Sequence, residues 1–129
     1  MQKMIATLML FALLVLPAFA KQDAEQQKIA YLIDSVATLQ GATFIRNGVE
    51  YDATHAADHM RLKLRFAGSR VKTAQDFITY CGTGSSMSGT KYTIRFKDGR
   101  VVDSAVFLRN KLAGYATSHE HPVLVSPVH

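Results

Sequence analysis

Two histidines four positions apart are the first residues in the sequence that could do chemistry. On a helix, His55 and His59 would present both imidazoles on one side, with two aspartates nearby. A zinc site needs three or four protein ligands, so a third would have to come from the C-terminal His119 or His121. No glutamate follows His55 directly, so the zinc-protease pattern fails. We therefore predict no metal site and no cofactor, and keep weak metal binding through His55 and His59 as an alternative.

Three serines in a glycine-rich stretch, residues 82–89, suggest a second kind of chemistry. Ser85, Ser86 or Ser88 could be a nucleophile if His59 were the general base and an aspartate oriented the imidazole. The Gly-x-Ser-x-Gly elbow is absent from the sequence. Serine hydroxyls in such a stretch also bond the local backbone, as in ordinary turns. A small serine-dependent hydrolase therefore stays an alternative to the function favoured below.

A site for an anionic or polar ligand needs no aligned catalytic residues. A Gly/Ser loop can turn several backbone amides toward one point, and nearby Arg and Lys side chains could add charge. We expect the turn at residues 46–48, the loop at residues 85–89 and the His59 side of a helix to meet at one end of the molecule. Alternatively, Arg46 pairs with an acidic neighbour and Asn47-Gly48 only makes a turn. The predicted ligand- or partner-binding residues are Arg46, Asn47, Tyr51, His59, Arg61, Ser85, Ser86, Ser88 and Tyr92.

Helical periodicity predicts the elements that must position these side chains. Helices are expected over residues 22–40, 53–66 and 105–112, with a short one starting near residue 74. In the first, apolar residues recur at three-four spacing: Ile29, Leu32, Ile33, Val36 and Leu39. Side-chain N-caps are expected at Asp23, at Asp52, at Thr73 with Asp76, and at Asp103 or Ser104.

Short strands are predicted at residues 43–46, 91–96 and 101–102. Residues 49–51 are either a returning strand after the Asn47-Gly48 turn or a loop. The pattern predicts a single small α+β domain over residues 21–113, with three to four helices packed on a short antiparallel sheet. Residues 114–129, which hold two prolines and three histidines, are predicted to be a loose tail.

The first twenty residues have the organisation of a secretory signal peptide. Lys3 is followed by an apolar run and then by the small residues of Ala18-Phe19-Ala20. The run at residues 4–16 is short for a membrane span, although a retained anchor is the alternative. We predict cleavage after Ala20, export, and no stable membrane span afterwards. Loss of Lys3 lowers the formal net charge from +5 to +4, and the scattered charges predict an ordinary solvated surface and no nucleic-acid partner.

Cys81 is the single cysteine of the chain, so an internal disulfide is impossible. In an oxidising compartment a lone thiol is buried, pairs with another chain or is reactive. The apolar neighbours Phe77 and Ile78 favour burial.

Three fragments, in this order and spacing, resemble the YfeK-like proteins, small exported bacterial proteins with no established activity. They are Phe44-Ile45-Arg46-Asn47-Gly48, then His59-Met60-Arg61-Leu62-Lys63-Leu64, then Thr73-Ala74 with Phe77-Ile78 and the serine-rich stretch through Tyr92. The resemblance covers roughly residues 22–112 and implies a Gram-negative periplasmic setting. We therefore predict a non-enzymatic periplasmic binding or interaction module, whose partner is an unknown periplasmic protein or a small anionic or polar ligand.

Overall fold

The computed structural model of the protein describes residues 2–120. These residues form a single small α+β domain with four helices and a four-stranded antiparallel sheet, as the sequence predicts. The elements in chain order are α1 (Gln2–Ala37), β1 (Thr43–Arg46), β2 (Val49–Tyr51), α2 (Ala53–Ala67), the 3-10 turn η1 (Gly68–Arg70), α3 (Ala74–Phe77), the π-helical turn η2 (Ile78–Gly82), β3 (Thr93–Arg95), β4 (Val101–Asp103) and α4 (Ser104–Glu120).

The sheet has the strand order β2-β1-β3-β4, so β1 and β3 are its central strands. Asn47 and Gly48 have positive φ angles of 50° and 75°, the conformation that a two-residue hairpin turn requires. Residues 49–51 are therefore a strand rather than a loop. Phe44 lies opposite Ile94, and Ile94 lies opposite Val102. Alternation along the strands places these three apolar side chains on one face of the sheet.

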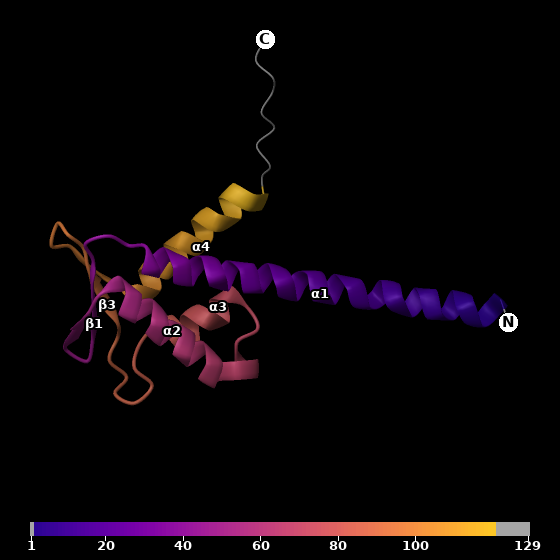
Figure 1. The fold of residues 1–129 in the computed structure, drawn as a ribbon, viewed down its shortest axis with the longest axis horizontal. Coiled ribbons are helices and arrows are strands. Elements are labelled where there is room, and N and C mark those ends of the chain that lie inside the picture. Colours follow the sequence, from indigo (N-terminus) through magenta and orange to yellow (C-terminus); the bar gives the residue numbers. More distant parts are fainter. Residues whose placement is uncertain (1, 121–129) are drawn as a thin grey trace, which may run out of the picture.

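The helices extend from the sheet toward one side of the molecule in Figure 1, and their apolar stripes form the core with it. The predicted stripe on α1 is confirmed, because four of its members are buried: Ile29, Leu32, Ile33 and Val36. It joins one cluster with Phe77, Ile78 and Leu108 from the other helical segments and with Phe44 and Ile94 from the sheet. Cys81 is fully buried, as predicted, and burial raises the pKa of its thiol.

Two of the predicted helix caps are confirmed. Asp52 accepts a hydrogen bond from the His55 amide at 2.8 Å and begins α2. Thr73 and Asp76 form a reciprocal capping box, with the Asp76 amide donating to Thr73 Oγ1 at 3.0 Å and the Thr73 amide donating to Asp76 Oδ2 at 3.2 Å. Backbone hydrogen bonds are the main reason that the pKa values of the Asp52 and Asp76 carboxyls are lowered.

Helix ends differ from the prediction in several places. Helix α1 begins at Gln2, so Asp23 lies inside it rather than at its N-terminus, and it ends at Ala37 rather than at residue 40. Helix α4 passes through Gly114 and continues to Glu120, so residues 114–120 are helical and not a loose tail. The extra turns are supported by Tyr115, whose ring lies 5.0 Å from the Tyr31 ring on α1. Residues 121–129, including His121, lie outside the described part of the chain.

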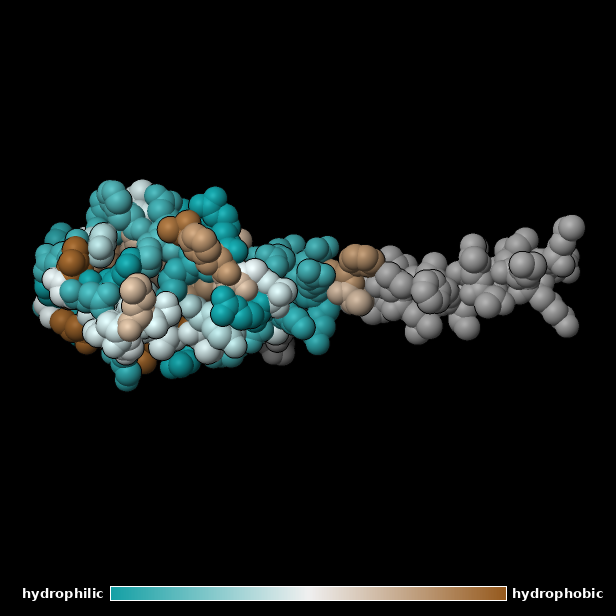
Figure 2. All heavy atoms as spheres, turned by 90° about the horizontal axis from the view of Figure 1, so that it is seen from below, coloured by the Kyte–Doolittle hydropathy of each residue, from teal (hydrophilic) through white to brown (hydrophobic). Residues whose placement is uncertain are grey.

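The surface of the domain is mostly polar. On the face shown in Figure 2, hydrophobic residues occur among hydrophilic ones rather than as one broad apolar area. The most exposed large apolar side chains are those of Met87 and Phe66, at 97% and 78%. Within the described residues, no helix is both long and apolar enough to cross a membrane.

Candidate functional site

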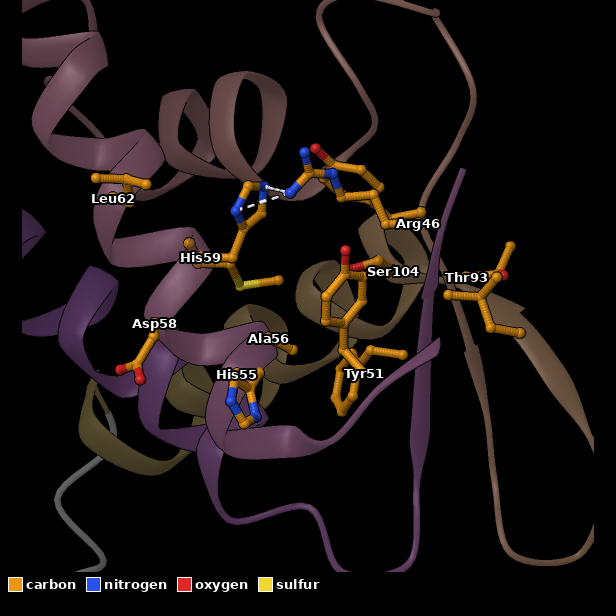
Figure 3. Close-up of a pocket in the computed structure, with 13 residues that line it drawn as sticks. Arg46, Tyr51, His55, Ala56, Asp58, His59, Leu62, Thr93 and Ser104 are labelled. Carbon is orange, nitrogen blue, oxygen red and sulfur yellow. Dashed lines mark hydrogen bonds between the residues drawn. The ribbon is translucent and has the colours of Figure 1, made fainter. Parts of the chain in front are cut away.

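A cavity of about 290 Å³ lies where β1, β2, α2, the start of β3 and the start of α4 meet. Most of its wall is apolar, and the apolar side chains that line it include Phe44, Met60, Leu62 and the ring of Tyr92. In Figure 3, the polar side chains of Arg46, Tyr51, His59 and Ser104 reach toward the same space from β1, β2, α2 and α4. The cavity is at the lower end of the volumes typical of ligand pockets.

Arg46, the last residue of β1, brings a cation to this cavity. Its Nη1 atom lies 2.9 Å from Nδ1 and 2.7 Å from Nε2 of His59. A neutral imidazole offers one acceptor nitrogen, so one of these two contacts is a hydrogen bond at a time. Among the described residues, Arg46 forms no ion pair with a carboxylate. The acidic partner that the alternative interpretation required is therefore not found there.

The surroundings of His59 favour the neutral form of its imidazole. Burial is the largest cause of its lowered pKa, and the charges of Arg46 and Lys63 lower the pKa further. The ring also meets the Tyr92 ring edge to face, with 6.2 Å between the ring centroids. At neutral pH, His59 can thus accept a hydrogen bond from Arg46 without adding charge to the cavity.

Lys63 is a second cation beside His59, and the sequence patterns did not identify it. Its Nζ atom donates to the Gly84 carbonyl at 2.8 Å and to the Tyr92 hydroxyl at 3.1 Å. It also lies 4.9 Å from the centroid of the Tyr92 ring, where a cation is attracted by the aromatic face. These contacts attach the loop that precedes β3 to the middle of α2. Helical periodicity could not identify this role, because both partners of Lys63 are more than twenty positions away in the sequence.

Ser104 contributes a buried hydroxyl that has no hydrogen-bond partner within the described residues. Only 1% of the residue is exposed, yet it lines the cavity. Its backbone amide is satisfied by the Tyr92 carbonyl at 2.9 Å. The expectation that Ser104 caps α4 is wrong for its side chain, and Asp103, the other candidate, pairs with Lys91 at 3.5 Å. The sequence alone cannot distinguish a serine whose hydroxyl has no hydrogen-bond partner from a serine that caps a helix.

The serine loop meets the hairpin turn but contributes little to the cavity. Ser88 donates to the Asn47 side chain at 2.7 Å, joining the loop to the turn beside Arg46. Ser85 is buried, and its hydroxyl accepts hydrogen bonds from the Met87 and Ser88 amides, both at 3.3 Å. Ser86 is exposed and is not part of the cavity wall. The loop hydroxyls therefore fold the loop itself.

Arg61 does not join the other predicted residues. It pairs with Asp58 at 2.8 Å on the exposed side of α2 and lines a separate hollow beside α1 with Tyr31 and Asp34. Of the nine predicted residues, four line the cavity: Arg46, Tyr51, His59 and Tyr92. Asn47, Ser85 and Ser88 hold the adjoining turn and loop.

The metal and hydrolase alternatives gain no geometric support. His55 is at the outer rim, where its Nδ1 atom contacts Asp52 at 2.7 Å, while His59 faces Arg46. His119 stacks on Tyr115 at 3.9 Å between ring centroids. Across residues 2–120, no three metal-ligating side chains converge. The hydrogen bonds recorded for this part of the chain include none between His59 and a loop serine.

Comparison with known proteins agrees with the resemblance found in the sequence. Residues 23–116 match the "Family of unknown function (DUF5329)". The chain belongs to this family. It is 37% identical over 81 residues to the "Uncharacterized protein YfeK" of Salmonella typhimurium, an alignment that covers 62% of this chain and 68% of the relative. No solved structure matches.

Proposed function

We propose that the chain is a non-enzymatic binding protein of the periplasm whose ligand, small and anionic or polar, occupies the cavity between the β1–β2 hairpin and α2. The observation that carries the proposal is the Arg46 guanidinium, which lines a mostly apolar cavity without a carboxylate partner among the described residues. Burying part of a cation without a counter-charge is costly, and a bound anion would offset that cost. The signal-peptide pattern at residues 1–20 supports export.

A binding function explains the arrangement of the polar side chains at the cavity and in the serine loop better than a catalytic function does. A general base must come within hydrogen-bond reach of the group it deprotonates. His59 directs its ring nitrogens at Arg46, and the Ser85 hydroxyl is occupied by loop amides. Neither arrangement activates a nucleophile. The remaining donors of Arg46 have no acceptor among the described residues, and they need only a ligand that accepts hydrogen bonds.

A small molecule suits this site better than a macromolecule does. The cavity volume of about 290 Å³ is close to the lower limit for ligand pockets, which begin at roughly 300 Å³. The modest formal charge of +5 for the whole sequence is spread over many elements, so it forms no concentrated track for a nucleic acid.

Thermal unfolding in the presence of a panel of small organic anions and neutral polar compounds tests this proposal. A ligand at about 100 times its Kd stabilises the native state by about 2.7 kcal/mol, so a true ligand raises the melting temperature measurably. We expect at least one class of compound to stabilise the wild type, and Arg46→Gln to lose that effect.

Arg65→Gln is the matched control, because it removes the same charge from an exposed residue of α2 that does not line the cavity. This variant should respond to the same compounds as the wild type does. A panel without any stabilising compound, or equal responses from Arg46→Gln and the wild type, would contradict a ligand site at Arg46.

A further inference from the structure

The charges around the cavity favour an anion over a cation. Arg46 lines the cavity with its Nη1 atom 2.7 Å from His59 Nε2, and Lys63 lies one turn further along α2 from His59. Asp58 is a carboxylate of the cavity wall, but it is bonded to Arg61 at 2.8 Å and points away from Arg46 in Figure 3. The bond to His59 uses one of the five N–H donors of Arg46, and the described residues supply no acceptor for the others.

A second, independent observation points to a ligand at the same place. The Ser104 hydroxyl is buried, lines the cavity and has no partner within the described residues. A buried hydroxyl without a partner costs free energy, so a ligand or an ordered water would be expected to satisfy it. Ser104 is also the first residue of α4, a helix of 17 residues, so the positive end of the helix dipole lies at the cavity wall.

The rest of the wall requires an apolar group. Phe44 and Met60 are buried core residues whose side chains line the cavity, and Tyr92 adds its ring. An inorganic anion would leave this surface in contact with water, whereas a hydrocarbon body would cover it. The cavity volume of about 290 Å³ limits that body to a small one.

We infer that the ligand is a monocarboxylate with a compact aromatic or branched hydrocarbon body. Its carboxylate accepts hydrogen bonds from Arg46 and from the Ser104 hydroxyl, while its body lies against Phe44, Met60 and the Tyr92 ring. A carboxylate accepts the forked donors of arginine in pairs. A doubly charged phosphate would lose more hydration in the same space, and one guanidinium balances only part of its charge. This inference rests on the proposed function, because it assigns the chemistry of the same cavity.

Binding of three probes distinguishes the parts of this ligand: benzoate, its neutral isostere benzamide, and acetate, which has the head group alone. The full chain is expressed with ¹⁵N label, purified as the host processes it, and titrated while amide chemical shifts are followed. We expect benzoate to shift the amides around Arg46 and Ser104, and to bind at least tenfold more tightly than benzamide or acetate. A lost charge-assisted hydrogen bond of about 1.5–3 kcal/mol corresponds to tenfold or more in Kd.

Substitutions at Arg46 and Ser104 test whether these two side chains contact the ligand. Arg46→Gln should weaken benzoate binding at least tenfold and Ser104→Ala at least threefold, while Arg65→Gln, at an exposed position of α2 outside the cavity wall, keeps the wild-type Kd. Melting temperatures of the free variants show whether each remains folded. Ser104→Ala should be as stable as the wild type, because its hydroxyl has no partner in the described structure.

Each contrary outcome would contradict one defined part of the inference about the ligand. Equal affinity for benzoate and benzamide would contradict the claim that the ligand has a carboxylate. Equal affinity for benzoate and acetate would contradict the claim that it has a hydrocarbon body. An unchanged Kd in Ser104→Ala would mean that the hydroxyl binds only water. These three results leave a ligand site in the cavity intact. Binding of benzoate with shifts confined to other parts of the domain would overturn both the inference and the proposed function.

Discussion

The His59 imidazole lies near two cations, Arg46 of the cavity wall and Lys63 of the same helix. Arg46 approaches it from β1, Lys63 lies on the same helix, and the Tyr92 ring of the segment leading into β3 meets it edge to face. Burial first, and these two charges second, hold its pKa below the ordinary value of about 6.5. The folded state therefore resists protonation of this ring.

Acid should destabilise the domain in a window set by His59. Between the lowered folded-state pKa and about 6.5, the unfolded chain binds more protons than the folded one, so stability is complete above this window and falls as the pH drops through it. We expect the melting temperature of His59→Gln to fall less than that of the wild type between about pH 7.5 and about pH 5.5. Circular dichroism melts at a series of pH values measure the difference.

His55→Gln is the control from the same helix, since its side chain is 72% exposed. It should keep the acid sensitivity of the wild type over this range. The carboxyls of Asp52 and Asp76, whose pKa values are lowered, contribute stability that is lost only near and below their ordinary value of about 3.8. A His59→Gln variant as acid-sensitive as the wild type would show that another group causes the effect.

At the scale of elements, the π-helical turn η2 packs tightly against α4. It extends α3 by one wide turn, carries Cys81 into the core and ends at Gly82. A Cβ atom at Gly82 would overlap Cδ1 of Leu108, a fully buried residue of α4. The glycine is therefore required by the close approach of the two segments rather than by an unusual φ angle.

Gly82→Ala should lower the free energy of unfolding by about 1–3 kcal/mol, because the fully buried Leu108 side chain would have to shift within a packed core. The midpoint of urea unfolding measures the change, provided that the denaturant slope stays constant.

For Gly114→Ala in α4, we expect an increase in the free energy of unfolding instead. No atom outside its chain neighbours and helix backbone lies within 4 Å of an added Cβ there. Alanine should raise stability by roughly 0.5–1 kcal/mol, as expected for replacing glycine inside a helix. If both variants were equally stable, tight packing of η2 on α4 would be disproved.

The elements that the sequence predicted well depend on local patterns. The buried stripe of α1, the Asp52 cap and the Thr73–Asp76 box are each defined by residues within one helix or one turn. The extension of α4 was missed because Gly114 resembles a helix stop. The contact that supports the extra turns joins Tyr115 to Tyr31 of α1, which is distant in sequence.

The candidate site was only partly predictable for the same reason. Arg46, His59 and Tyr92 were identified as polar members of short fragments, and the structure places them around one cavity. Lys63 bonds the Gly84 carbonyl, and the unsatisfied state of the Ser104 hydroxyl depends on which atoms surround it. Such properties follow from tertiary packing, and no periodicity encodes them.

At the scale of the whole molecule, the first residues after the predicted cleavage position lie outside the described core. Residues 18–24 of α1 are exposed, and Ile29 is the first residue of this helix described as buried. Glu25 is the earliest described residue that bonds to another element, through the Ala74 amide at 3.4 Å. Residues 18–20, the part of the predicted leader whose burial is described, are all exposed, so their loss uncovers none of the core.

We predict that the exported protein starts at Lys21 and is as stable as the full chain, within about 0.5 kcal/mol. Intact-mass measurement of the periplasmic fraction identifies the N-terminus, and denaturant titration compares the two chains. Ile29→Ala, which removes a buried side chain, should instead cost about 2–5 kcal/mol. A full-length chain recovered from the membrane fraction would contradict the prediction.

The sheet order has a consequence for the kinetics of folding. The β1–β2 hairpin is local and can form in microseconds, but β1 must also pair with β3, which follows only after all of α2 and α3. Closing so long a segment is slow compared with local steps. The cavity needs both pairings, because its wall includes Arg46, Tyr51 and Tyr92. Since the ligand site is complete only after this closure, a bound ligand should slow unfolding while leaving the rate of folding unchanged.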